Sequence, residues 1–201
     1  MKNHEYRCET ASVLQIETRK DDDGKNRLRG YAAMFDRMSE NLGGFRERIQ
    51  RGAFQRSLDE GADVRSLWNH NSQYVLGRTR SGTLKLTEDE DGLRVDIDPP
   101  DTAWARDLMT SVERGDVNQM SFGFRVRVDG DKWDEDEEGR IIRTLMDVEL
   151  LEVSPVTFPA YPDTTIASRS LEQWRQQFLG VTPGIRRRRM EHALRMRNIH
   201  R

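Results

Sequence analysis

The residues best suited to chemistry in this chain are one histidine and one serine. Of the four histidines, only His70 lies away from the terminal segments. A neutral imidazole is the usual general base for a serine nucleophile near neutral pH. Ser121 stands beside Phe122 and Gly123 in an apolar, alternating run that favours a strand, where a hydroxyl is held rigidly. An isolated strand serine more often bonds only backbone, and a loop histidine is more often structural, so the neighbouring motifs decide the interpretation.

Short motifs surround these two residues in a fixed order along the chain. They are GYAA at 30–33, GAF at 52–54, WNHN at 68–71, LGRT at 76–79, GTLKL at 82–86, DGL at 91–93, GDV at 115–117, MSFGF at 120–124 and LEVSPVTFPAYP at 151–162. The ordered series closely resembles the prohead maturation proteases of tailed bacteriophages (caudoviruses). These are serine peptidases related in fold to the herpesvirus assembly protease, assemblin. The resemblance covers residues 10–168 and implies that Ser121 is the nucleophile and His70 the base.

The third catalytic group departs from the herpesvirus pattern, in which a second histidine takes this place. The body of the chain has no second histidine, so an acid must orient the imidazole and stabilise its cationic form. Glu152, in the Leu-Glu-Val-Ser motif that resembles the family, is the first choice, and Asp147 is the second. The alternative for Glu152 is a strand-end acid in a surface ion pair.

Strand geometry offers a way to compare these acids. If Arg127 pairs near Arg140 across the acidic segment between them, Ser121 faces residues around 146. Asp147 then lies close to Ser121, and Glu152 lies one to two residue pairs beyond. The oxyanion hole that acyl transfer requires is not identified by the sequence.

Composition excludes several other classes of protein. The single cysteine rules out an intramolecular disulfide framework and a multi-cysteine zinc site. One body histidine and scattered acids give no metal-ligand spacing, and no glycine-rich phosphate loop occurs. We therefore expect no cofactor and no metal. No apolar run approaches the ~18 residues that span a bilayer.

Charge is distributed unevenly between the body and the C-terminal segment. Residues 169–201 hold nine arginines against Glu172 and Glu191 and carry +7; since the whole chain carries −2, the remainder carries −9. This contrast predicts two parts, a protease domain at 1–168 and a basic tail at 169–201. Two short helices are expected in the tail, at 169–180 and from 186 onward. The resemblance implies a tail that docks on scaffold segments and is later cut off; the alternatives are a solvated tail and non-specific nucleic-acid contact.

Hydrophobic periodicity predicts a strand-rich α+β fold with antiparallel hairpins, and the family resemblance implies a mostly antiparallel, barrel-like domain similar to assemblin. Strands are expected at 9–17, 27–35, 45–49, 64–68, 84–86, 93–97, 121–128, 141–148 and 152–157, and short helices at 52–60 and 102–113. Residues 129–139 are expected to form an acidic loop. Pro155 predicts an edge or a bulge rather than an unbroken central strand.

The function implied by the resemblance is serine endopeptidase activity in the host cytoplasm, inside the assembling procapsid. Its substrates would be scaffold segments of the major capsid protein or a separate scaffold, and then the protease itself by autocatalytic cleavage. A homodimer is compatible with this interpretation, and no membrane is involved. The alternative from another class is a non-catalytic scaffold or capsid-assembly factor that recruits partners through the basic tail.

Overall fold

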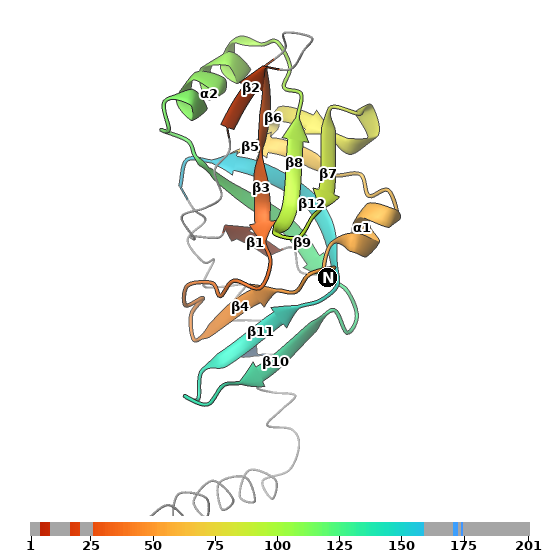
Figure 1. Cartoon of the computed structure of the whole chain (residues 1–201), viewed down its shortest axis with the longest axis vertical. Helices are drawn as coiled ribbons and strands as arrows, with labels where there is room; N and C mark the ends of the chain where they lie inside the picture. Colours follow the sequence, from red (N-terminus) through yellow and green to blue (C-terminus); the bar gives the residue numbers. More distant parts are fainter. Residues whose placement is uncertain (1–4, 9–16, 21–25, 159–170, 173, 175–201) are drawn as a thin grey trace, which may run out of the picture.

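The computed structural model describes residues 5–8, 17–20, 26–158, 171, 172 and 174. In this part of the chain three β-sheets and two short α-helices form a strand-rich α+β fold (Figure 1). All strand pairs but two are antiparallel, as predicted. The expected barrel is not observed, because the described strands stay in three separate sheets and do not close on themselves.

The largest sheet has five strands and combines segments from both ends of the described chain. Its central strand β12 is antiparallel to β9 and parallel to β5, so it joins the N-terminal and C-terminal halves. In spatial order the strands are β1 (Glu5–Cys8), β9 (Gln119–Val126), β12 (Val148–Val156), β5 (Arg65–Trp68) and β6 (Asn71–Arg78).

A four-stranded antiparallel sheet packs beside it. The predicted hairpin of 84–86 with 93–97 is confirmed, and the strand predicted at 27–35 is confirmed as β3. Only the last residue of its expected partner, 9–17, is in β2; residues 9–16 lie outside the described part. The order is β2 (Glu17–Lys20), β3 (Asn26–Met34), β8 (Gly92–Ile97) and β7 (Leu84–Glu88).

The third sheet corrects the prediction of an acidic loop at 129–139. It consists of β10 (Asp131–Glu135), β11 (Ile141–Leu145) and β4 (Phe45–Ile49), with β11 parallel to β4. Trp133 gives β10 an apolar anchor, since its ring packs 4.9 Å from that of Phe45. The neighbouring acids are paired with cations: Asp131 binds Arg143 and Asp134 binds Lys132. The negative charge therefore does not prevent a strand here.

Two helices close the apolar core at the positions predicted. They are α1 (Gln55–Asp59) and α2 (Ala103–Glu113), and a short 3-10 turn, η1 (Thr79–Ser81), follows β6. α2 has the spacing of an amphipathic helix and buries Leu108 and Val112 in the core. Phe54, just before α1, meets the ring of Phe122 edge-on at 5.4 Å, a favourable geometry for an aromatic pair.

Pro155 is the penultimate residue of the central strand β12, beyond the point where the pairing with β5 ends, so it lies at a local edge, as predicted. β12 pairs with β9 on one side through Pro155 and Val156, but its register with β5 ends at Val153. The carbonyl of Pro155 accepts the Asn69 N–H, so its missing N–H would point to that same side. No ladder donor is lost, because β5 has already given way to a turn there.

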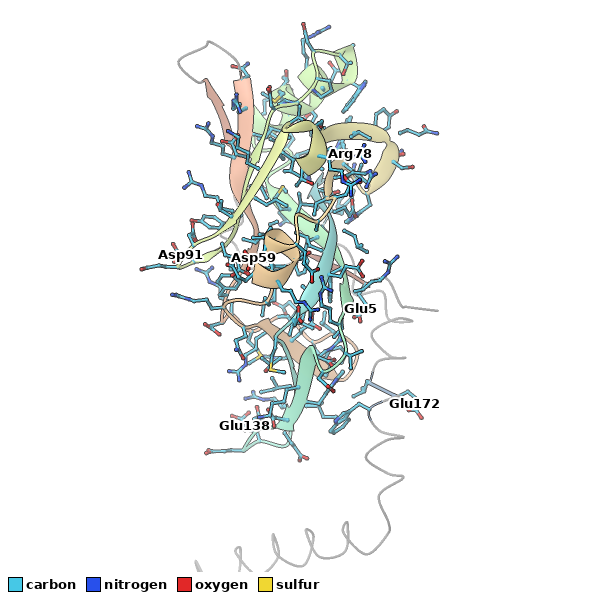
Figure 2. All side chains as sticks on the ribbon, turned by 90° about the vertical axis from the view of Figure 1, so that its right-hand side faces the viewer. Glu5, Asp59, Arg78, Asp91, Glu138 and Glu172 are labelled. Carbon is cyan, nitrogen blue, oxygen red and sulfur yellow. The ribbon has the colours of Figure 1, made fainter. Side chains whose placement is uncertain are left out.

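A buried arginine joins the first strand to the three-stranded sheet. Arg143 is only 3% exposed, and its guanidinium binds Glu5 (2.7 and 3.1 Å), Glu47 (3.1 Å) and Asp131 (2.7 Å). Burial opposes the charged form, but the carboxylates of Glu47 and Glu5 outweigh it and hold the pKa of Arg143 above its usual range. Figure 2 labels Glu5, which lies on β1 beside β9.

The described residues of the C-terminal segment pack on this same sheet. Leu171 is buried with Leu42 and Phe45, and the Trp174 ring stacks on Trp133 with centroids 5.7 Å apart. These residues lie beyond the predicted boundary at 168, so the beginning of the segment contacts the body. The division into 1–168 and 169–201 stays a prediction. Of the tail, only residues 171, 172 and 174 are described, so the two helices expected at 169–180 and from 186 onward lie largely outside the described residues.

No helix in the described part is long and apolar enough to span a membrane.

Replacing Arg143 tests the importance of the buried ion cluster. Arg143→Leu removes the cation that the buried Glu5 and Glu47 share, so we expect a loss of about 3–5 kcal/mol in the free energy of unfolding, measured by urea denaturation. Arg140→Leu is the matched control, because that side chain is 51% exposed and solvent screens its pairs with Asp136 and Glu138, so its loss should change stability little. Equal losses in the two variants would contradict a special role for the cluster.

Candidate functional site

His70 lies in the tightest connection of the five-stranded sheet. Trp68 pairs with Asn71, so Asn69 and His70 alone form the turn between β5 and β6. Both have positive φ, 52° and 58°, which is the signature of a type I′ hairpin turn. Asn and His are among the non-glycine residues that enter this region most readily. A two-residue turn leaves the imidazole little freedom of position.

The turn is also tied to the end of β12 by its other residue. The Asn69 N–H donates to the Pro155 carbonyl oxygen (2.9 Å). The Asn69 side chain donates from Nδ2 to Thr157 Oγ1 (3.1 Å) and accepts the Thr157 N–H at Oδ1 (2.8 Å). Asn69 thus fixes the histidine-bearing turn to the strand that carries Glu152.

A β-bulge decides which side chains of β12 face Ser121. Leu150 pairs with Phe124, but Glu152 pairs with Gly123, so Leu151 is an extra residue in β12. Without it, Ser121 would pair with Val153, because a slip of one residue moves every side chain to the opposite face. With it, Ser121 pairs with Ser154, and both share a face with Glu152.

The same shift keeps the other face of these two strands apolar. Phe122 and Phe124 on β9, together with Leu150 and Val153 on β12, are fully or nearly fully buried in the main core. The polar face and the apolar face of β9 and β12 are therefore separated cleanly. Gly123, opposite Glu152, adds no side chain to the polar face.

Glu152 holds the imidazole from the sheet. Its Oε1 is hydrogen-bonded to His70 Nδ1, and its Oε2 accepts a hydrogen bond from the Ser154 hydroxyl at 2.8 Å. The carboxylate is buried, with 6% of its side chain exposed, while 23% of the His70 side chain is exposed. A carboxylate at Nδ1 favours the tautomer with the proton on Nδ1, in which Nε2 can accept a proton.

The predicted site residues fall into two groups in the structure. His70 and Glu152 are in contact, and Ser121, which is fully buried, lies on the same face of the sheet as Glu152. Asp147 is not brought to them: it pairs with Arg56 (3.2 Å) and Arg127 (3.4 Å) where β12 begins.

The expected pairing of Arg127 near Arg140 is wrong. The Arg127 N–H donates to the Asp147 carbonyl, and Val126 pairs with Val148, because residues 131–145 form a separate hairpin. Ser121 therefore faces Ser154 instead of residues around 146.

Two functional candidates were missed by the sequence analysis, Asn69 and Ser154. Ser154 follows Glu152 by two positions, which places it on the same face of a strand. Asn69 precedes the histidine in a two-residue turn between strands, where Asn is a preferred residue. The Asn69 signal depends on knowing that β6 exists, and the polar composition of residues 69–73 concealed that strand.

An ion pair fixes the opposite end of the hairpin. Arg78 donates two hydrogen bonds of 2.6 Å to the Asp63 carboxylate. Arg65 of β5 lies opposite Arg78 of β6 in the strand register. The hydrogen bonds from Arg78, opposed by burial and assisted by the charge of Arg65, lower the pKa of Asp63 to about 2. Figure 2 labels Arg78 on this hairpin, far from Glu138 at the tip of the β10–β11 hairpin.

Among the described residues, no group of three or more His, Cys, Asp or Glu side chains is arranged to hold a metal ion.

A serine on a strand, an imidazole at the adjoining turn and a carboxylate bonded to that imidazole are the groups with which serine hydrolases transfer acyl groups. This set of side chains fits the serine-hydrolase class of protein. The chain belongs to the caudovirus prohead serine protease family, whose sequence model matches residues 14–177. It is a serine protease of bacteriophage capsid maturation, and the family resemblance seen in the sequence is confirmed.

Two known proteins illustrate the relationship. The prohead protease of Enterobacteria phage HK97 is 30% identical over 187 residues, which span 86% of this chain and 78% of that protein. The solved structure of the bacteriophage T4 capsid assembly protease, gp21, covers 77% of this chain and 96% of its own, with a TM-score of 0.46 and 8% identity. This second likeness is too distant to carry an argument, and the relation in fold to assemblin stays a prediction.

Removing the Asn69 side chain should loosen the turn that carries His70. Asn69→Ala deletes two hydrogen bonds and puts alanine at positive φ, so we expect about 1–3 kcal/mol less stability and a 10- to 100-fold lower kcat/KM for peptide cleavage. Asn71→Ala is the matched control, since Asn71 is exposed and its side-chain oxygen accepts a hydrogen bond from the N–H of the nearby Gln73. Wild-type activity in Asn69→Ala would show that the turn keeps its geometry without the Asn69 side chain.

The Asp63–Arg78 pair predicts a dependence of stability on acid. Because the pKa of Asp63 lies at about 2 in the folded protein against 3.8 ordinarily, its contribution is complete above pH 3.8 and is lost as the pH falls toward 2. The thermal midpoint of Asp63→Asn should therefore fall less steeply over this range than that of the wild type. Asp101→Asn, at a side chain that is 90% exposed, should keep the wild-type slope.

Proposed function

We propose that Ser121, His70 and Glu152 form the catalytic triad of this protease. The observation that carries the proposal is the hydrogen bond between Glu152 and His70 Nδ1, on the face of the sheet that β9 and β12 share at Ser121. The carboxylate orients the imidazole and stabilises its cation, and Nε2 is left to exchange a proton with the nucleophile. Asp147, the second choice for the acid, pairs with two arginines instead.

The reaction follows from these roles in two halves. His70 Nε2 takes the Ser121 proton as Oγ attacks the scissile carbonyl carbon, and the tetrahedral intermediate then breaks its C–N bond. His70 gives the proton to the departing amine, leaving an acyl group on Ser121. In the second half a water molecule loses a proton to His70 and attacks the acyl carbon; Ser121 then leaves and recovers its proton.

We propose that the substrates are the scaffold segments of the major capsid protein, or a separate scaffold protein, followed by the protease itself. Membership of a prohead protease family and the likeness to a phage prohead protease support this class of substrate. The cleavage would take place inside the assembling procapsid in the host cytoplasm. Confinement there supplies a high local substrate concentration, so weak intrinsic affinity suffices.

The basic segment 169–201 supplies the second part of the proposal. Its +7 charge against a body of −9 is suited to docking on acidic scaffold segments, and the segment would be cut off as maturation proceeds. We also propose that the arginines of this segment contact nucleic acid and that the protein self-associates as a homodimer. Nucleic-acid binding through the arginines would weaken as the salt concentration rises.

Coexpression with the major capsid protein of the same phage tests the catalytic assignment. The wild type should give a truncated capsid protein and a shortened protease, whereas Ser121→Ala and Glu152→Gln should each slow cleavage at least ~10³-fold, since each removes one member of a triad that acts as a unit. Intact mass spectrometry of both proteins maps the cut sites. The matched acid control is Asp147→Asn, which we expect to cleave within about threefold of the wild type because its carboxylate lies outside the triad.

Two other outcomes of this coexpression would contradict the catalytic assignment. Truncation that persists in Ser121→Ala would assign the cutting to another nucleophile or to a host protease. Assembly without cleavage in the wild type would favour the scaffold factor.

A further inference from the structure

Ser154 is a buried serine on the catalytic face that the triad does not include. It has no solvent exposure, and it lies directly opposite Ser121 in the pairing of β9 with β12. Its hydroxyl donates to Glu152 Oε2 at 2.8 Å. Since Glu152 Oε1 is bonded to His70 Nδ1, each oxygen of this carboxylate has its own defined partner.

The position of Ser154 follows from the strand that it shares with the acid. Two residues apart on β12, Glu152 and Ser154 project from the same face, so the acid and the hydroxyl that binds it move together. The terminal torsion of a glutamate is broad and only loosely restricted by its own rotamer preferences. A donor on Oε2 removes that rotation and presents Oε1 to the imidazole.

The direction of this hydrogen bond also separates the two serines of the site. Ser154 gives its proton to a carboxylate that is already bonded to the imidazole on its other oxygen. A nucleophilic serine must instead give its proton to the imidazole. The geometry therefore suits Ser154 to hold the acid and leaves the nucleophile's role to Ser121.

We propose that Ser154 is a positioning residue, whose hydroxyl sets the orientation of the Glu152 carboxylate against His70. This inference rests on the proposed triad. Through Glu152, Ser154 controls how well His70 is aligned, without touching the substrate.

The test uses the full chain and a probe that needs no known cleavage site. The rate of covalent labelling by a fluorophosphonate reports attack by the activated serine, and peptide mapping by mass spectrometry locates the adduct. Ser154→Ala should label about 10- to 100-fold more slowly than the wild type, because a hydrogen bond to a charged group is lost. Ser154→Thr keeps the hydroxyl and suits a strand, so it should recover most of the rate.

A matched control separates positioning from packing. Ser66 on β5 is also fully buried and pairs with Val153, on the face of the sheet opposite to Glu152. Ser66→Ala therefore makes the same chemical change without removing a donor to the acid, and it should label at close to the wild-type rate.

Proton NMR gives a readout that is independent of labelling. An imidazole N–H bonded to a carboxylate has a far-downfield resonance, which His70 should show in the Ser121→Ala background. Adding Ser154→Ala should shift or broaden this resonance, and adding Ser66→Ala should leave it in place.

The outcomes distinguish the inference from the function on which it rests. Undiminished labelling at Ser121 in Ser154→Ala, or an unchanged downfield resonance, would overturn the positioning role and leave the triad intact. An equal loss in Ser66→Ala would assign the effect to packing and overturn the role as well. If the Ser121→Ala variant is labelled as fast as the wild type, or if the adduct is found on Ser154, the proposed triad itself is overturned.

Discussion

The pairing of β9 with β12 is the constraint on which both the core and the site depend. One extra residue, Leu151, shifts this register so that two apolar side chains of β12 reach the core on one face and Glu152 lies on the other, which is the face of Ser121. A bulge is a small irregularity, but a register is a collective property of the strand. Deleting or moving the bulge would turn Glu152 into the core and an apolar side chain of β12 toward Ser121. The burial of Phe122 and Phe124 therefore stabilises the register that places Glu152 on the face of Ser121, because the alternative register would bury a carboxylate in the core.

A second constraint holds the edge strand next to this pair. β1 is short, and its neighbour in the sheet is the strand of Ser121. Arg143 fixes it from another sheet through Glu5, and the ring of Trp133 lies 5.3 Å from the same guanidinium. Trp174 stacks on the far end of this arrangement. The first described strand and the described C-terminal residues are thus linked through Arg143 and Trp133, in a sheet that contains none of the proposed catalytic residues.

The sequence predicted much of this from periodicity alone, and its failures have physical causes. The hairpin at Glu88–Gly92 and helix α2 carried clear local signals, and ordered motifs singled out His70 and Ser121. The strands β6 and β10 were missed because polar side chains conceal strands that are held by pairing and ion pairs rather than by burial. The register error had a different origin: it assumed the simplest hairpin from β9, whereas an inserted hairpin and a bulge are properties of tertiary pairing. Glu152 was chosen by motif, and its contact with His70 is visible only in the folded chain.

The two-residue turn at Asn69–His70 has a consequence for when the enzyme becomes active. A histidine on a long loop can move with that loop. This turn has only two residues and is hydrogen-bonded to Thr157, just after β12, so His70 has little freedom to move. His70 can reach Glu152 only after β5 has paired in parallel with a strand more than eighty residues downstream. Pairings of such sequence separation are intrinsically slow to form. A newly made chain therefore lacks the assembled site until β12 has been synthesised and has paired with β5.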